Sequence, residues 1–494
     1  MIKERNESAA QIVDGQQRLT TLAILLSAIR HVCGDVAPDF ADALTPFLYE
    51  KGNVVRGTVD QPRLSLRDRD SGFFYTYIQA EGGMAKLRDI SNDDLQDVRR
   101  NVRDNGLFYL DELRKLSPTK LKRLAQFIIN RCFLIIISTP DLEYAYRIFS
   151  VLNNRGMDLS ETDILKAEIL GAIPENEDRA EYNEAWEDVE EALGRQAFRD
   201  LFSHIRMIDH PVKASENLLA EIRKVLDPTR NPQAFIEKKL LFFGDAYSKI
   251  LSAQPIDGEP DGLTAALFWL KKIDNADWLP PAILFHAEYA ESNEQLTRFF
   301  ADLDRLAVVL SLERANKDKR IQRYGRVVKA IVKGDDLYAA DSPLQLTEKE
   351  KENTRKRLEG DIYPMHATLR RYILLRLEET ISTNGALYQY PAASVDQVLP
   401  YNPAAQSAWR EQFPNPPQYA NSLANMALLS RKITKQVQQQ PFKEKQEAYQ
   451  KVQDEGYPFM LTTQVLREKK WTEAIMQRRQ RYLLRKLVRL WRLE

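Results

Sequence analysis

The chain has 494 residues, which exceeds a single ordinary hydrophobic core and predicts two or three domains. Its 71 basic and 71 acidic residues cancel, so overall charge does not indicate a nucleic-acid or membrane partner, and any such binding must come from local patches. Two cysteines, Cys33 and Cys132, exclude a disulfide framework and are expected in the core of a protein from a reducing compartment. No apolar run is long enough to cross a bilayer, no signal peptide precedes the first motif, and the scattered histidines argue against a zinc site.

The first informative segment is residues 12–22, IVDGQQRLTTL. Two β-branched residues lead into a glycine turn, and the turn precedes an apolar helix predicted from Leu19 to Ile29. Backbone N–H groups at such a junction converge on anions, and the planar guanidinium of Arg18 suits a phosphate or a carboxylate. The alternative is a surface turn in which Asp14 caps the helix. Spacing alone leaves both interpretations open.

The remainder of residues 1–170 is predicted to form a mixed α/β region. Residues 63–66 alternate like a short strand, and the apolar run 132–137 is typical of a buried strand. A helix is expected over residues 142–152.

A second dense motif covers residues 149–163, FSVLNNRGMDLSETD. Gly156 permits a turn and Ser160 can cap a new helix, so a structural helix-loop-helix accounts for much of it. That interpretation leaves Asn153 and Arg155 unexplained, because their amide and guanidinium groups would supply donors to one point in space.

The region from about residue 175 to 385 is predicted to be almost entirely helical. Amphipathic segments recur at 218–226, 235–250, 296–312 and 365–380, without a fixed repeat period that would indicate a solenoid. The strongly charged segment from Asp335 to Glu359 predicts a solvated helix pair with a loop.

After about residue 385 the composition shifts to a loop-rich, proline- and aromatic-containing stretch and then to helices. The final segment, 466–493, combines an apolar leucine stripe with many basic side chains. These are Arg467, Lys469, Lys470, Arg478, Arg479, Arg481, Arg485, Lys486, Arg489 and Arg492. A docked helix with a solvated basic face is the favoured interpretation, and a contact with a nucleic-acid backbone is the alternative.

The motifs DGQQRLTTL and FSVLNNRGMDLSETDILK together resemble the bacterial GmrSD-type family, also called the DGQQR family. Its members act in defence against phage, often as modification-dependent (type IV) restriction enzymes. The resemblance implies an N-terminal module of ParB/sulfiredoxin-like fold that binds and hydrolyses a nucleoside triphosphate (UTP, GTP or ATP). It also implies a nucleotide site formed by Asp14, Gly15, Gln16, Gln17, Arg18, Asn153 and Arg155.

The C-terminal segments VDQVLPYNP, LANMALLS and FMLTTQVL resemble the second module of the same family, an HNH-like, metal-dependent nuclease. There the family motif carries a histidine as general base, and this chain has Gln397 instead. A neutral amide cannot accept a proton from water near pH 7, so we expect a degenerate active site. The resemblance assigns it to Asp396, Gln397 and Asn425, with Asp396 as the ligand for Mg²⁺ or another divalent metal. Loss of the base predicts a rate loss of about 10²–10⁴-fold.

The sequence therefore predicts an α+β, predominantly helical protein. Residues 1–172 are expected to form the nucleotide-binding module, 173–384 a helical middle region, and 385–494 the HNH-like module. The family's first module begins well before the motif at Asp14, whereas only thirteen residues precede it here. We therefore expect a truncated ParB/sulfiredoxin-like module, or a partner chain that completes it.

The predicted function is that of a nucleotide-dependent, DNA-targeting anti-phage defence protein resembling type IV restriction endonucleases. The alternative is a catalytically inactive family member that acts as a DNA-binding or regulatory subunit. A purely structural helical interaction protein is least favoured, because two family motifs occur together. The expected partners are phage or modified DNA and a second copy or another chain, with no membrane, in the bacterial cytoplasm.

Overall fold

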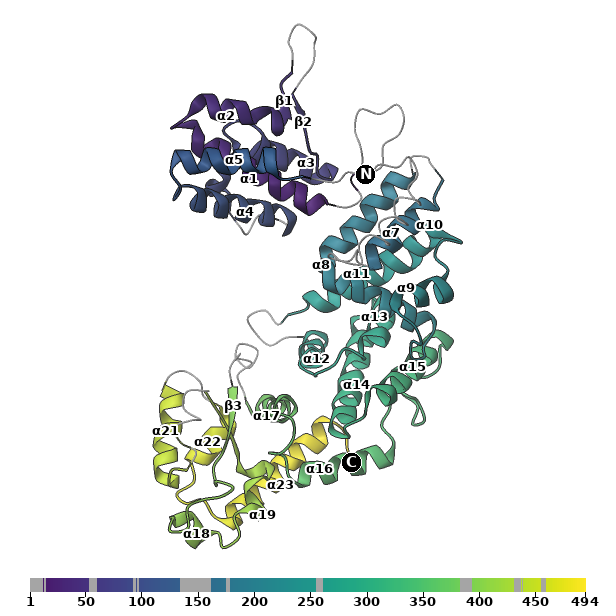
Figure 1. Ribbon diagram of the computed structural model, residues 1–494. Helices are drawn as coiled ribbons and strands as arrows, with labels where there is room; N and C mark the ends of the chain where they lie inside the picture. The colour runs from purple at the N-terminus through teal and green to yellow at the C-terminus, as the bar shows by residue number, and fades with distance from the viewer. Residues whose placement is uncertain are drawn as a thin grey trace. The chain divides into compact units, whose positions relative to one another are not determined.

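The computed structural model describes residues 12, 15–52, 60–91, 95, 97–133, 161–174, 178–254, 261–382, 393–430, 437, 439–454 and 459–494. Contacts divide the chain into two compact units, Met1–Ser160 and Glu161–Glu494 (Figure 1). Most described residues are helical and the described sheets have two strands each, which confirms the predicted fold class. The predicted division into three regions stays a prediction. Over the described ranges, no helix has both the length and the apolar character needed to cross a membrane.

The first unit is a small helical assembly with one short strand pair. Its elements are α1 (Gln16–Gly34), α2 (Pro38–Leu44), η1 (Thr45–Phe47), β1 (Tyr49–Glu50), β2 (Gln61–Pro62), α3 (Asp68–Phe74), the π-helical η3 (Tyr75–Gln79), the 3-10 helix η4 (Gly83–Asp89), α4 (Asp97–Leu113) and α5 (Pro118–Arg131). Strands β1 and β2 pair antiparallel, with Tyr49 opposite Pro62.

Helix α1 is the centre of this unit and packs on α2 and α4. Ala28, Ile29 and Cys33 are completely buried within the apolar cluster that α1 forms with its neighbours. Arg30 is also buried, and its guanidinium donates to the carbonyl oxygens of Gln79 at 2.6 Å and Ala80 at 3.0 Å. A helix that is apolar on nearly all sides must be surrounded by other elements, which is the reason for its central place.

Two sequence-based expectations in this unit were wrong. Residues 63–66 are not a strand, because the ladder is formed by β1 and β2 just before them. Cys132 is exposed where α5 ends, although Cys33 is buried as expected. The remainder of the predicted strand 132–137 and the helix 142–152 lie outside the described residues.

The second unit contains a long helical part followed by a smaller part with an antiparallel pair of strands. We call this pair the hairpin, although short helices lie between its two strands. The helical part comprises α7 (Glu161–Gly171), α8 (Asp178–Asp209), α9 (Leu218–Glu221), the π-helical η5 (Ile222–Leu226), α10 (Pro232–Phe235), the π-helical η6 (Ile236–Leu241), α11 (Phe242–Ser252), α12 (Gly262–Leu270), α13 (Leu279–Glu288), α14 (Asn293–Leu312), α15 (Lys317–Lys333), α16 (Glu348–Glu359) and α17 (Ala367–Ile381). The hairpin part comprises β3 (Ala393–Gln397), α18 (Ala408–Gln412), α19 (Pro417–Ala420), the 3-10 helix η8 (Leu423–Asn425), β4 (Met426–Ser430), α21 (Phe442–Asp454), α22 (Met460–Leu466) and α23 (Glu473–Leu490). The four predicted amphipathic segments of the middle region are helical, except that α17 begins at Ala367 and not at residue 365.

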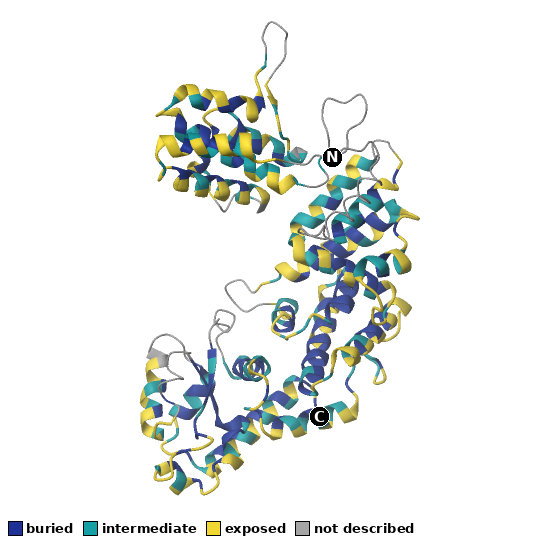
Figure 2. Cartoon of the chain, viewed as in Figure 1, coloured by how far each residue is buried: buried dark blue, intermediate teal, exposed yellow. Residues whose placement is uncertain are grey.

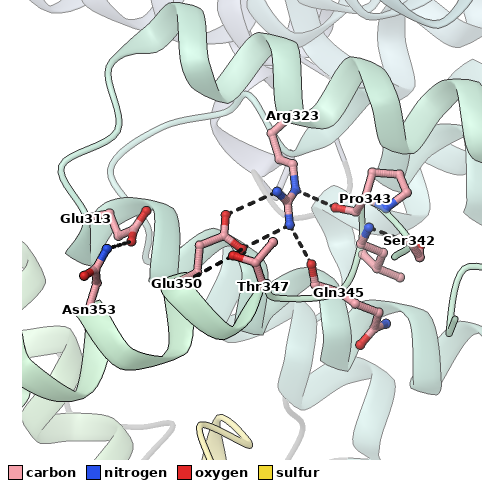
Figure 3. A network of polar contacts seen from close by, with 9 residues as sticks. Glu313, Arg323, Ser342, Pro343, Gln345, Thr347, Glu350 and Asn353 are labelled. Atoms are coloured by element: carbon pink, nitrogen blue, oxygen red, sulfur yellow. Dashed lines mark hydrogen bonds and ion pairs between the residues drawn. The ribbon is translucent and has the colours of Figure 1, made fainter. Parts of the chain in front are cut away.

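The charged segment after α15 differs from the predicted solvated helix pair. It forms one helix, α16, preceded by a loop whose Leu344 is completely buried. Arg323 holds this loop, because its guanidinium donates to the carbonyl oxygens of Pro343 and Gln345, each at 2.6 Å, and pairs with Glu350 at 3.2 Å (Figure 3). Glu350 also completes the capping box with Thr347 at the start of α16. The hydrogen bonds from Arg323 to these backbone carbonyl oxygens therefore stabilise a partly buried loop within a segment whose high charge predicts exposure to water.

The β3–β4 hairpin lies between two hydrophobic clusters. Its strands pair antiparallel, with Asp396 opposite Ala427 and Gln397 opposite Met426. Val395 and Met426 belong to the large cluster of the helical part, whereas Ala427 belongs to a separate cluster formed with α21 and α23. The buried hairpin strands are visible among the dark blue elements in Figure 2. The hairpin part therefore shares one core with the helical part, which explains why both belong to one unit.

Candidate functional site

Asp396 is the predicted site residue with the most distinctive surroundings. It lies on β3, is 5% exposed, and faces α21. Its Oδ2 accepts hydrogen bonds from Lys445 Nζ at 3.1 Å and from the Tyr449 hydroxyl at 2.6 Å. Lys445 and Tyr449 are one helical turn apart on α21, so their side chains reach the same carboxylate.

Burial controls the electrostatics of this cluster. It raises the pKa of Asp396, and the Lys445 ammonium is the largest of the influences that oppose the rise. Burial also lowers the pKa of Lys445 and raises the pKa of Tyr449 well above its usual value. Asp396 and Lys445 pair because neither retains enough water to hold its charge alone, and the neutral hydroxyl of Tyr449 donates a further hydrogen bond to the carboxylate.

Gln397 occupies the position of the missing general base, and its side chain lies on the other face of the hairpin. Its Nε2 donates to the carbonyl oxygen of Ala420 at 2.9 Å and to Asn421 Oδ1 at 3.1 Å. Adjacent residues of a strand point to opposite faces, so the Gln397 amide does not join the Asp396 carboxylate. The connection between them is a backbone one, in which Lys445 Nζ donates to the carbonyl oxygen of Gln397 at 2.5 Å.

Asn425 holds together three segments around the hairpin and is completely buried. Its Nδ2 donates to the carbonyl oxygens of Leu399 and Ala420, both at 2.8 Å. Its Oδ1 accepts from the Leu399 amide at 2.8 Å and from Trp471 Nε1 at 3.2 Å. These four hydrogen bonds use both donors and both lone pairs of the amide, so the arrangement positions the backbone after β3.

The side chains around Asp396 do not form a set of ligands for a divalent metal. Across the ranges that the structure describes, no three His, Cys, Asp or Glu side chains gather into a group that could hold a metal ion. The counter-ion of Asp396 is the ammonium of Lys445, which is 0% exposed. A hard cation such as Mg²⁺ requires several oxygen ligands, and a buried ammonium beside it would repel it.

Two buried ionisable side chains that were not predicted as site residues meet the backbone at the start of α22. Glu378, 2% exposed on α17, accepts hydrogen bonds from the backbone amides of Met460 and Leu461 at the start of α22. Arg479 on α23 donates to the carbonyl oxygens of Met426 at 2.9 Å and Leu461 at 2.7 Å, and also to that of Ala424. Burial raises the pKa of Glu378 to about 7 and lowers the pKa of Arg479 to about 10.

The N-terminal motif lies at the start of α1. Helix α1 begins at Gln16, so Gln16, Gln17 and Arg18 form its first turn and do not precede it, and all three are exposed. Gly15 is the N-cap residue with φ of 89°, a left-handed conformation that favours glycine, and no side chain caps the helix. The Arg18 guanidinium turns back toward Gly15. Its Nη2 would lie 3.8 Å from a Cβ atom placed on that glycine.

The structure brings together only part of each predicted site. Gln397 and Asn425 meet at the carbonyl oxygen of Ala420, whereas Asp396 turns toward α21. Asp14, Asn153 and Arg155 lie outside the described residues, so the seven-residue nucleotide site stays a prediction. The spacing of Lys445 and Tyr449 on one helical face is the signal that could have identified the partners of Asp396.

Comparisons with protein families place both ends of the chain in one family. The model described as "GmrSD restriction endonuclease, N-terminal domain" matches residues 1–170. The model described as "GmrSD restriction endonucleases, C-terminal domain" matches residues 347–486, which include the hairpin, the Asp396 cluster and most of α23. A search of curated proteins gave no match. The two models together match more than half of the 494 residues, and the chain belongs to the GmrSD restriction endonuclease family.

Proposed function

We propose that this chain is a nucleotide-dependent, DNA-targeting defence protein of the restriction type whose C-terminal module binds DNA without cleaving it. The family match supports DNA as the target. The observation that carries the second half of the proposal is the buried contact between Asp396 and Lys445. Hydrolysis of a phosphodiester requires an activated water, and this site combines a neutral amide at Gln397 with a carboxylate whose charge Lys445 already balances.

The cleavage test uses the purified chain with Mg²⁺ or Mn²⁺, each triphosphate, and modified and unmodified phage DNA. We expect no cleavage by the unaltered chain. We also expect none by Gln397→His, because the histidine restores a base but leaves Lys445 against Asp396. Metal-dependent cleavage by the unaltered chain that disappears in Asp396→Asn would refute the proposal and favour an active restriction endonuclease.

The nucleotide-binding part of the proposal rests on the first turn of α1. The first amides of a helix have no acceptor within the helix and attract anions, and α1 has no acidic residue in its first turn. The exposed Arg18 adds a guanidinium beside these amides. Phosphate groups of a nucleoside triphosphate fit this combination of charge and donors.

Phosphate release from UTP, GTP and ATP, together with equilibrium binding of each nucleotide, tests this assignment. Arg18→Ala should weaken binding at least tenfold, as expected for the loss of one charged hydrogen-bonding group. Arg123→Ala is the matched control, because Arg123 is an exposed arginine on α5 of the same unit. Equal binding by the Arg18→Ala chain and the unaltered chain would remove Arg18 from the site.

A further inference from the structure

The outward face of α23 carries a row of arginines. Met476, Leu483 and Leu487 are buried on its inner face. Four exposed residues, Arg478, Arg481, Arg485 and Arg489, follow one another at intervals of three or four positions. At 3.6 residues per turn they fall within roughly 80° of arc on the side opposite the buried leucines. We call these four residues the arginine stripe.

The charge of this stripe is poorly balanced by its surroundings. The chain as a whole is neutral, yet residues 474–493 include no acidic residue. Arg478 pairs with Glu468 at 2.5 Å. For the side chains of Arg481, Arg485 and Arg489, no ion pair or hydrogen bond is found within the part of the chain that the structure describes. A face that serves solubility alone usually mixes both signs of charge.

The stripe continues into a hollow at the end of α23. A cavity of about 370 Å³ is lined by Lys351, Arg489, Arg492 and Glu494. Three cations and the acidic Glu494 line this hollow, and Arg492 pairs with Asp302 and Lys351 with Glu348. The hollow is therefore of mixed charge and marks the end of the stripe, and the unbalanced positive charge lies on the stripe itself.

A membrane surface does not fit this helix. Amphipathic helices bind bilayers by inserting their apolar face, and here Leu483 and Leu487 are 0% exposed within the protein core. The face that remains accessible is cationic and extended. It suits a partner whose negative charges are regularly spaced along a line, as they are in a nucleic-acid backbone.

We propose that the arginine stripe binds the phosphate backbone of duplex DNA without reading its sequence, an inference that rests on the proposed function. From Arg478 to Arg489 the helix rises about 16 Å, at about 1.5 Å per residue. Measured along the duplex axis, at about 3.4 Å per phosphate, this length equals the rise of about five phosphates of one strand, so the row is long enough to meet several of them. Because the stripe is a single row, it engages one strand along its backbone and leaves sequence or modification recognition to other parts of the protein.

The test measures binding of the full chain to a fluorescent duplex of about 25 base pairs, from 50 to 200 mM salt, with and without each triphosphate. In Arg481→Gln/Arg485→Gln/Arg489→Gln we expect at least tenfold weaker binding and a salt slope smaller by about 2 to 3, since each phosphate contact contributes about 0.9. Replacement of the same three arginines by lysine should retain affinity within a few fold. The matched control, Lys120→Gln/Arg123→Gln/Arg131→Gln, removes the same charge from α5 of the other unit and should bind like the unaltered chain.

Circular dichroism verifies the fold of every variant. Four results would overturn the proposal. Unchanged affinity and salt slope in the glutamine variant would overturn the stripe alone. Equal loss in the control variant, or equally tight binding of polyglutamate to the unaltered chain, would show only a general attraction for polyanions. Failure of the unaltered chain to bind any duplex would overturn both the stripe and the proposed function.

Discussion

Replacement of Glu378 by glutamine should change how the stability of the second unit depends on pH. The carboxyl of Glu378 is buried under α22, and its pKa is raised from the usual 4.5 to about 7 mainly by burial. The amides of Leu461 and Met460 and the charge of Arg479 oppose this rise without cancelling it. The folded protein therefore holds a proton on Glu378 at pH values where the unfolded chain has lost it.

The sign and size of the effect follow from this pKa difference. The stabilising contribution is fully present below about pH 4.5 and is lost as the pH rises through about 7. At about 1.36 kcal/mol per pKa unit, the free energy of unfolding should fall by about 3 kcal/mol between pH 4.5 and 8. Glutamine cannot ionise, so Glu378→Gln should lack this fall and become more stable than the unaltered chain at pH 8.

Urea unfolding followed by tryptophan fluorescence measures this effect, because all six tryptophans lie in the unit Glu161–Glu494. The quantity to compare is the difference in unfolding free energy between Glu378→Gln and the unaltered chain at several pH values, since other titrations cancel in it. Glu359→Gln, at an exposed position on α16, provides the control. A difference that stays constant within about 1 kcal/mol from pH 5 to 8 would refute the argument from burial.

Three further substitutions test other contacts. Lys445→Met should cost about 3–5 kcal/mol in the same urea assay because it leaves Asp396 buried without its counter-ion, and adding Asp396→Asn should recover more than 1 kcal/mol. Asn425→Leu should cost about 3 kcal/mol or more in that assay, because it removes four hydrogen bonds, including the one from Trp471. Gly15→Ala should destabilise the start of α1 by about 1 kcal/mol through its left-handed backbone, measured by amide hydrogen exchange because the first unit contains no tryptophan.

Each of these three expectations has a result that contradicts it. Strictly additive effects of Lys445→Met and Asp396→Asn would show that the two groups do not interact in the folded protein. A loss below about 1 kcal/mol in Asn425→Leu would mean that water or a rearranged backbone replaces the amide. Unchanged exchange rates in Gly15→Ala would contradict the left-handed conformation at the start of α1, since an added Cβ meets only the flexible Arg18 side chain there.

Several features of the protein were determined by the sequence alone, because they depend on local spacing. Periodic apolar residues predicted the helices of the middle region, and the leucine pattern of α23 predicted which face is buried. The motifs in residues 1–170 and 347–486 were enough to indicate the family. Gln397 at the position of the family histidine is likewise visible without coordinates.

Only the tertiary structure decided how the chemical groups are paired. Asp396 and Lys445 are 49 positions apart, and they meet because α21 packs against one face of the β3–β4 hairpin. Alternation along β3 turns Gln397 to the opposite face, but only the tertiary structure supplies the groups that its amide meets there, the carbonyl oxygen of Ala420 and Asn421 Oδ1. In sequence Arg479 resembles its exposed neighbours, yet it is buried and its guanidinium donates to three backbone carbonyl oxygens. Burial and partner choice depend on contacts between distant segments, and these contacts determine which charges remain available to a ligand.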